Sequence, residues 1–179
     1  KDLLPPIIGL AECWGISVIH CPFCHGYEVR QANTGILGTG DMVFDFTRLI
    51  SNWTNNLTVF SNGRASFTLV QMEQLHQHNI GIVEKEIDQL VHKDGQLQMV
   101  LFRDGSTFPL EALYAPSPFE QHCRIPESLG CALTGEGYIE TDSTQESTVP
   151  GVYAIGDNAA KMRTVANAVA MGTATGILL

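Results

Sequence analysis

The stretch NTGILGTGDMVFDFTRLISNW, residues 33–53, carries the strongest fold signal in this sequence. An apolar run ends at Leu37, a glycine turn follows, and apolar side chains then recur at near-helical spacing from Val43 to Ile50. This pattern predicts a strand, a turn and a helix over about residues 41–53. The segment NLTVF, residues 56–60, predicts the next strand, so the elements form one βαβ unit with a parallel sheet.

The glycine turn has the start of a dinucleotide-binding fingerprint, G-x-G-x-x-G/A. Gly38 and Gly40, with Thr39 and Asp41, would let a pyrophosphate approach the backbone at a helix N-terminus. Val43 stands where the fingerprint requires a small residue. An ordinary strand-to-helix turn has the same first residues, so both interpretations stay open on this motif alone.

The loop after the second strand predicts which nucleotide would bind. An NAD enzyme places an acidic residue there for the ribose 2′-hydroxyl. This sequence has no acid in that loop and instead offers donors from Ser61 to Arg64. A 2′-phosphate, and hence NADP, is favoured.

The rest of the chain predicts an α/β protein with an added antiparallel part. Asp-Gly pairs between apolar runs predict a three-stranded antiparallel β-meander over residues 86–110. The other expected features are a helix at 67–78, a strand at 80–84, a proline-marked domain crossing at 111–121, strands at 137–142 and 151–156, and a final helix at 164–179.

Gly156 and Asp157 end the last predicted strand, just before a helix that is rich in small residues. The carboxylate would suit a cofactor hydroxyl, with the helix N-terminus facing the cofactor. A strand-end aspartate that caps a turn explains the same pattern, and the residues alone favour this second interpretation.

The motif Cys21-Pro22-Phe23-Cys24-His25 has three chemical interpretations: a redox pair, half of a zinc site, or an attachment site for haem. Zinc needs two further ligands, and Cys123 and Cys131 lack knuckle spacing. Haem needs an axial ligand and an export route. A pair directly before a nucleotide-binding turn is placed to receive electrons, so we predict a redox pair and no metal.

Composition narrows the function classes. The 179 residues have a net charge of -9 and only 10 scattered Lys and Arg, which disfavours a nucleic-acid partner. No run is long enough to cross a bilayer, and no secretory signal is visible. Five cysteines with one close pair fit a reducing compartment, so we expect a cytoplasmic protein.

In chain order, CPFCHGYEVR, GILGTGD, STVPGVYAIGD and RTVANAVAMG together resemble the low-molecular-weight thioredoxin reductase family. The resemblance covers essentially the whole chain. It implies a Rossmann-like NADP-binding domain inserted into an FAD-binding domain. It also implies hydride transfer from NADPH to FAD, followed by two-electron reduction of the cysteine pair.

The resemblance also implies roles for individual residues. Cys21 corresponds to the cysteine that exchanges with the outside disulfide, and Cys24 to the one that meets the flavin. For the cofactors, it implies Gly38, Thr39, Gly40 and Asp41 at the NADP pyrophosphate, Ser61 and Arg64 near the 2′-phosphate, Gly156 and Asp157 at the flavin ribityl chain, and Arg163, Thr164 and Val165 beside the isoalloxazine. The basic pair that follows the second strand in thioredoxin reductases is not reproduced.

His25 is a departure from the usual C-x-x-C-D form. The C-x-x-C-H-G form is similar to flavoprotein dithiol oxidases that close disulfides in small natural products. The substrate is therefore either a thioredoxin-like protein or a small dithiol or disulfide, with oxygen as the electron acceptor in the oxidase case. Histidine exchanges protons near neutral pH, so we predict that His25 serves the thiol step.

The family begins with a glycine turn that grips the FAD pyrophosphate, and nothing before Cys21 matches it. We therefore interpret the chain as a fragment that binds little FAD by itself. The expected parts are residues 1–14, the tail of the FAD domain; 15–115, the NADP-binding domain; and 116–179, the C-terminal part of the FAD domain. The family suggests a homodimer, and a nucleotide-binding module without turnover is the remaining alternative.

Overall fold

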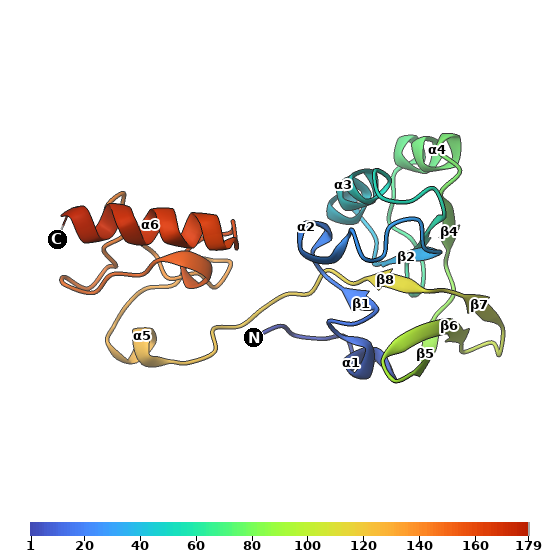
Figure 1. The fold of residues 1–179 in the computed structure, drawn as a ribbon, viewed down its shortest axis with the longest axis horizontal. Coiled ribbons are helices and arrows are strands. Elements are labelled where there is room, and N and C mark those ends of the chain that lie inside the picture. Colours follow the sequence, from blue (N-terminus) through green and yellow to red (C-terminus); the bar gives the residue numbers. More distant parts are fainter. Residues whose placement is uncertain (179) are drawn as a thin grey trace. The chain divides into compact units, whose positions relative to one another are not determined.

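A computed structural model describes residues 1–178 and divides into two compact units. The first unit runs from Leu4 to Ser117, and the second joins Lys1–Leu3 to the chain from Pro118 onward. In chain order, the first unit contains α1 (Leu10–Cys13), β1 (Val18–Ile19), α2 (Pro22–His25), β2 (Thr34–Leu37), α3 (Asp41–Ile50), β3 (Leu57–Phe60), α4 (Leu69–Gln77), β4 (Gly81–Val83), β5 (Ile87–Lys93), β6 (Gln96–Phe102), β7 (Thr107–Pro109) and β8 (Ala112–Tyr114) (Figure 1). The second unit contains α5 (Ile125–Ser128), the 3-10 helix η1 (Gly156–Asn158) and α6 (Val165–Leu178).

The centre of the first unit is a five-stranded sheet in the order β1-β8-β2-β3-β4, with parallel neighbours throughout. β2 pairs with β3 from Thr34 opposite Leu57 to Leu37 opposite Phe60. Every residue of β2 is buried, as expected for a parallel strand that is covered on both faces. The predicted βαβ unit is confirmed.

The sheet is the middle of three layers (Figure 1). On one face, Val43 and Phe44 of α3 and Leu75 of α4 share a core with sheet residues such as Ile36. The other face packs on the antiparallel sheet β5-β6-β7 and on α1. The α/β class with an added meander is therefore confirmed.

A buried serine connects the meander to the parallel sheet. The Ser17 hydroxyl, just before β1, donates to the Gly95 carbonyl at 2.6 Å and accepts from the Leu97 N–H at 3.0 Å. Both partners belong to the β5–β6 hairpin, which is distant in sequence. These bonds fix the point at which the chain enters the sheet.

The sequence predicts a domain crossing over residues 111–121, and the boundary between the two units, after Ser117, lies inside that range. The strand at the start of the range was not predicted. Ala112–Tyr114 is β8, which lies between β1 and β2. β8 is only three residues long and is followed directly by Ala115 and Pro116, so it is too short for a hydrophobic periodicity to show. Both neighbouring strands lie far away in sequence, and the two-residue β1 was not predicted at all.

Helix α3 ends at Ile50, three residues before the predicted end. The Ser51 hydroxyl donates to the Arg48 carbonyl at 2.8 Å, and the Asn52 amide donates to the Leu49 carbonyl at 3.0 Å. Side chains thus satisfy carbonyls that a further helical turn would otherwise bond.

The second unit has little regular structure before α6. Instead of the strands predicted at 137–142 and 151–156, it forms isolated bridges that pair Leu133 with Ile139, Thr141 with Ser147, and Glu146 with Tyr153. These strand predictions are wrong because nearby side chains take the hydrogen bonds. The Asp142 carboxylate accepts from the N–H groups of Thr144 and Glu146, which closes a local turn. The predicted final helix is confirmed as α6 over Val165–Leu178, and Leu179 lies outside the described residues.

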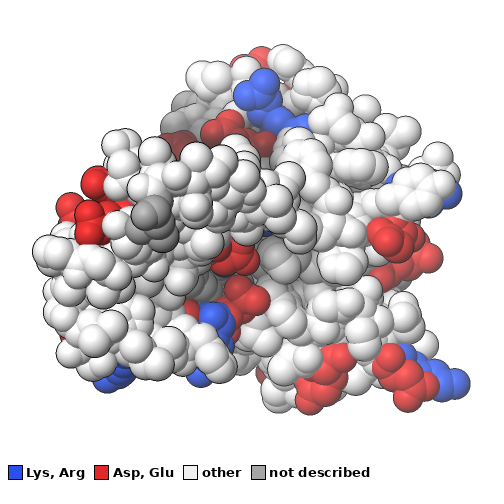
Figure 2. Space-filling model, turned by 60° about the vertical axis from the view of Figure 1, so that its left-hand side comes forward, with Lys and Arg blue, Asp and Glu red and all other residues white. Residues whose placement is uncertain are grey.

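Charged side chains do not gather by sign on the surface that Figure 2 shows. Lys and Arg stand apart from one another there, among acidic and uncharged residues. Within residues 1–178, no helix is both long enough and apolar enough to span a bilayer.

Candidate active site

The carboxyl edge of the parallel sheet collects the predicted thiol and nucleotide-binding residues of the first unit. Cys21 follows β1, the Gly38–Asp41 turn follows β2, and the Ser61–Arg64 loop follows β3. The chain leaves β2 toward β3 on one side and later returns to β8 on the other. Open α/β sheets bind ligands where the strand order reverses in this way.

The cysteine pair spans the first turn of the short helix α2. Cys21 is its N-cap, with extended backbone at φ −124° and ψ 114°, and Pro22 occupies an N-terminal position that suits proline. The N–H groups of Cys24 and His25 donate to the Cys21 carbonyl at 3.3 Å and 3.2 Å. The helix thus holds the two thiols side by side.

Both cysteines are free thiols, with Cys21 half-buried and Cys24 exposed. The hydrogen bond with the Cys21 sulfur raises the pKa of Cys24, and burial raises it further. Cys24 therefore keeps its proton and can donate it to a negatively charged Cys21 sulfur. This geometry suits Cys21 as the attacking thiolate.

Two histidines flank the pair in different environments. His25 lies exposed in the last turn of α2, within the same turn as Cys24. His20 stacks on Trp14, with ring centroids 5.7 Å apart and an interplanar angle of 18°. Both side chains are exposed, and His25 is the one that shares the turn of α2 with Cys24.

The glycine turn has a backbone that favours glycine. Gly38 has φ +128° and Gly40 has φ +84°, both in the left-handed region. No side chain caps the N-terminus of α3, so its first N–H groups are open to an anion. The carboxylate of Asp41 accepts from the Gln71 amide at 2.8 Å, which connects this turn to α4.

Val43, the departure from the fingerprint, packs directly on the turn. A Cβ atom added at Gly38 would lie 2.9 Å from a Val43 methyl group. Close packing of helix on strand is preserved because Gly38, rather than residue 43, lacks a side chain.

The loop after β3 is held by its own side chains. Ser61 is 8% exposed, and its hydroxyl donates to the Gly63 carbonyl at 2.6 Å, so this donor shapes the loop. Arg64 is exposed, and its side chain makes no hydrogen bond or ion pair within residues 1–178. The Glu84 carboxylate accepts a hydrogen bond from the Ala65 N–H at 2.7 Å. A negative charge therefore lies beside the residue that directly follows Arg64.

The remaining predicted residues belong to the second unit. Gly156 has φ +76°, and a Cβ there would lie 3.2 Å from the Ala168 Cβ, so close packing with α6 accounts for this glycine. Asp157 is exposed, and the Arg163 guanidinium lies 4.4 Å from the centre of the Phe119 ring.

At the start of α6, the Thr164 hydroxyl accepts from the Asn167 N–H at 3.1 Å, as a helix cap does. Val165 follows it and is 83% exposed. The roles that the sequence gives these residues beside a flavin stay predictions.

Residues 32–172 match the family described as pyridine nucleotide-disulphide oxidoreductase. The chain belongs to this family. The match includes the glycine turn, the meander and most of the second unit, and the cysteine pair lies just before it.

Individual relatives of this oxidoreductase are named thioredoxin reductases. Thioredoxin reductase tcpT of Claviceps purpurea is 29% identical over 184 residues, which cover 98% of this chain and 57% of the relative. Thioredoxin reductase aclD of Aspergillus oryzae is 27% identical, over 88% of this chain and 53% of the relative. This chain is therefore thioredoxin reductase-like, and it spans about half the length of the curated relatives that it matches.

Solved structures agree with this assignment. HlmI has a TM-score of 0.89 and 29% identity, over 100% of this chain and 56% of HlmI. An oxidoreductase from Agrobacterium tumefaciens has a TM-score of 0.88 and 30% identity, over 99% of this chain and 60% of that protein.

Three residues of this chain, Ser66, Glu84 and Tyr114, lie at the candidate site without having been predicted there. The Thr39 hydroxyl accepts from the Ser66 N–H at 2.7 Å, which links the glycine turn to the loop after β3. Glu84 joins that loop through Ala65, and Tyr114 ends β8 beside β1. No sequence motif marks these positions, because each is brought there by strand order.

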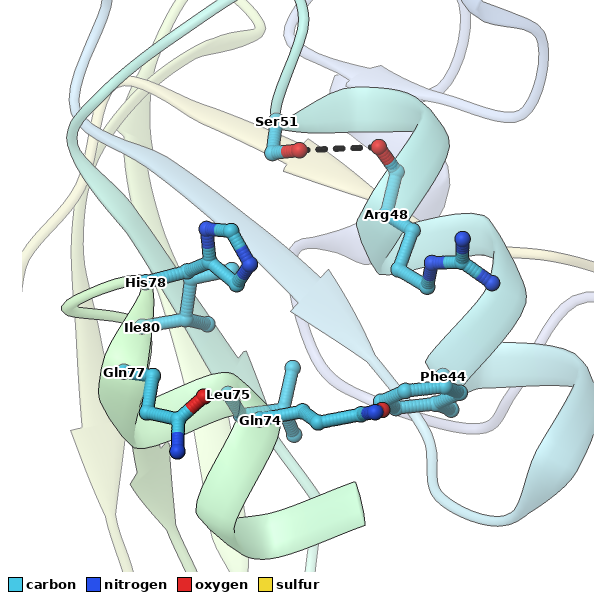
Figure 3. A pocket seen from close by; sticks show the side chains of 8 residues that line it. All are labelled: Phe44, Arg48, Ser51, Gln74, Leu75, Gln77, His78 and Ile80. Carbon is cyan, nitrogen blue, oxygen red and sulfur yellow. Dashed lines mark hydrogen bonds between the residues drawn. The ribbon is translucent and has the colours of Figure 1, made fainter. Parts of the chain in front are cut away.

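A separate hollow of about 410 Å³ lies between α3 and α4 (Figure 3). Phe44, Arg48 and Ser51 line it from α3, and Gln74 and Gln77 line it from α4. None of the predicted site residues lines this hollow. Within residues 1–178, no group of three or more His, Cys, Asp and Glu side chains is arranged to hold a metal ion.

Proposed function

We propose that this chain is part of an FAD- and NADPH-dependent oxidoreductase that acts on disulfides or dithiols through Cys21 and Cys24. The observation that carries the proposal is the contact between the two free thiols, in which the Cys21 sulfur raises the pKa of Cys24. The pair stands at the edge of the sheet where the glycine turn also lies.

In the reducing direction, the Cys21 thiolate attacks one sulfur of a substrate disulfide. A Cys21–substrate disulfide forms, and the other substrate sulfur leaves as a thiolate that takes up a proton. Cys24, after losing its proton, then attacks Cys21. The second substrate thiolate leaves, and a Cys21–Cys24 disulfide forms that holds the two-electron oxidation. In this proposal, His25, which is exposed in the same turn as Cys24, holds and returns the protons of these exchanges.

The residues of each unit fit one cofactor. The open N–H groups at the start of α3, reached through Gly38 and Gly40, fit a pyrophosphate of NADP. The exposed carboxylate of Asp157 fits a flavin hydroxyl. When bound, FAD would supply the two electrons that reduce the cysteine pair.

The first test asks whether the pair forms a disulfide and turns over. Cys21→Ser and Cys24→Ser should each abolish disulfide formation and substrate turnover. Cys123→Ser, which changes an exposed thiol of the second unit, should leave both unchanged. Mass spectrometry with and without reductant measures the disulfide. Full turnover in Cys21→Ser would refute the proposed function.

One observation favours a second candidate function, a dithiol oxidase. The Ser61 hydroxyl already donates to the Gly63 carbonyl inside its own loop. The negative charge of the Glu84 carboxylate beside Ala65 would repel a 2′-phosphate. In this alternative, a small dithiol loses two electrons and two protons to become a disulfide, and one O2 takes them up to become H2O2. The cysteine pair and the flavin carry the electrons between them.

Nucleotide binding separates the two candidates. If NADPH is the electron donor, it binds more tightly than NADH, and Arg64→Ala reduces that preference by about tenfold because a charge-assisted hydrogen bond is lost. Glu84→Gln should increase the preference, since it removes a charge and keeps an acceptor for the Ala65 N–H. Equal calorimetric affinities for NADPH and NADH, together with oxygen consumption on a small dithiol, would support the oxidase.

A further inference from the structure

Tyr114 has a buried hydroxyl without a partner. The side chain is 1% exposed, and its oxygen is the one buried side-chain N or O atom without a hydrogen-bond partner in residues 1–178. Buried polar atoms are nearly always paired, so such an atom in a folded protein requires an explanation. A buried hydroxyl without a hydrogen-bond partner lowers the free energy of unfolding, so an unpaired hydroxyl at this position is unfavourable.

Strand geometry places this hydroxyl on the same side of the sheet as Cys21. Tyr114 is the register partner of Ile19, and both pack in the core beneath α3 and α4. Side chains alternate between the two faces of a strand, so Cys21, two residues after Ile19 and with extended backbone, faces the same side. His20, between them, stacks on Trp14, which packs against the opposite core. The effect of negative charge at Cys21 on the pKa of Tyr114 agrees with this placement.

The Tyr114 ring is held in place by α3. Phe46 meets it edge-on, with ring centroids 5.7 Å apart and an interplanar angle of 80°. Burial, together with smaller contributions from negative charge on Cys21 and on Glu28, raises the pKa of Tyr114 to about 12. The phenol therefore stays protonated, as a donor, at every pH at which thiols react.

We propose that the Tyr114 hydroxyl donates a hydrogen bond to the sulfur of Cys21, directly or through one water, when that sulfur is a thiolate. Tyr114 is then a positioning residue that stabilises the attacking form of Cys21. This inference rests on the proposed function in one respect, the assignment of Cys21 as the attacking thiol.

Other groups also influence this sulfur. Cys24 contacts it from α2, and His25 lies exposed in the same helix. Glu28 follows α2, and Phe46 of α3 is uncharged. A comparison in the Cys24→Ser background leaves one titrating thiol in the pair. His25 and Glu28 are identical in both arms of that comparison.

The test is the pH profile of Cys21 alkylation by iodoacetamide, followed by mass spectrometry of the Cys21 peptide. Tyr114→Phe should move the midpoint of the profile to higher pH by about one unit, because a hydrogen bond to a charged group is lost. Tyr27→Phe, which removes the same atom from a 64% exposed ring near the pair, should leave the midpoint in place. A midpoint that is unmoved, or moved to lower pH, in Tyr114→Phe overturns the inference.

A second measurement excludes a merely structural effect. Because the Tyr114 oxygen has no partner, Tyr114→Phe should keep or raise the free energy of unfolding. If that variant does not fold, 3-fluorotyrosine at position 114 gives the opposite test: a stronger donor should move the midpoint to lower pH. An unmoved midpoint there overturns the inference.

The outcome is distinguishable from failure of the proposed function. Alkylation measures one thiol and requires no disulfide. An unmoved midpoint with a working Cys21–Cys24 disulfide removes Tyr114 and leaves the proposed function intact. A shifted midpoint in a protein whose pair forms no disulfide establishes the hydrogen bond and refutes the function.

Discussion

At the scale of single residues, the candidate site depends on protons. Cys24 keeps its proton because of the Cys21 sulfur, and Tyr114 keeps its own because of burial. His25 is exposed in the same turn, where it can exchange protons with solvent. Cys24 and Tyr114 thus both keep their protons, for two different physical reasons.

His25 should affect the thiol step and not the flavin step. In the flavin-loaded protein, His25→Ala should slow the thiol half-reaction by about 10²-fold, because a positioned proton carrier is lost. Reduction of the flavin by NADPH should change little. Stopped-flow absorbance resolves the two half-reactions.

The matched control is His20→Phe, which keeps a ring on Trp14 and removes the other histidine beside the pair. It should leave the thiol step nearly unchanged. An equally fast thiol step in His25→Ala would exclude this histidine from the mechanism.

Tyr114 should make the fold sensitive to high pH. Its pKa is about 12 in the folded chain and about 10 in an unfolded one, so the folded state binds the proton more tightly. This contribution to stability is fully present below pH 10 and is lost as the pH rises toward 12. Denaturant titrations measure the free energy of unfolding at pH 9 and at pH 11.5. Its decrease between these two pH values should be smaller in Tyr114→Phe than in the parent chain. An equal decrease in the free energy of unfolding in the variant and in the parent chain would contradict the burial of this phenol.

At the scale of elements, the β2–α3 turn keeps its close packing although the small residue stands in the turn and not on the helix. The fingerprint puts its third small residue on the helix, whereas this chain has Val43 there and depends on Gly38 for close approach. The departure in sequence therefore does not open the packing between β2 and α3.

Gly38→Ala should be destabilising for two reasons: its positive φ, and the contact of the new methyl with Val43. The expected loss is about 1–3 kcal/mol in the free energy of unfolding. Gly63 has nearly the same φ, +121°, but a Cβ atom there would meet no neighbouring atom. Gly63→Ala should therefore lower the free energy of unfolding by less than Gly38→Ala does. Urea denaturation measures both.

The contact with Val43 makes a further prediction for the double variant. Adding Val43→Ala to Gly38→Ala should cost less than the two single losses together, because the collision is removed. Strict additivity of the two changes would show that the methyl groups do not meet.

At the scale of the whole chain, the two units differ in the size of their cores. The first unit buries two clusters, one on each face of its sheet. The second unit buries one small cluster around Cys131, Ile139 and Ala154, and α6 exposes apolar side chains such as Val169 and Ile177. Burial of apolar area is the main stabilising contribution, so the first unit should be the more stable.

Hydrogen exchange should resolve this difference. Amide protons of β2 and β8 should exchange at least about 10²-fold more slowly than those of α6, since exchange follows the free energy of local opening. Peptide-resolved mass spectrometry on the 179-residue chain measures this ratio. Equal protection in α6 would show that its exposed apolar face is covered in solution.

The sequence alone determined whatever short-range pattern can encode. The run from Thr34 to Ile50 has the apolar order of a strand and a helix, and Asp-Gly pairs mark the meander. Two cysteines separated by two residues indicated the thiol chemistry, and the paired glycines indicated the nucleotide chemistry. The family resemblance depended on the same motifs.

Tertiary structure decided what depends on neighbours distant in sequence. β8 is a strand because β1 and β2 lie on either side of it, and three residues are too few for a periodicity to show. The bridges after Ile139 are not strands because Asp142 closes a local turn. Tyr114 reaches the thiol edge only because β8 lies beside β1, since parallel pairing, and not chain order, sets which side chains meet.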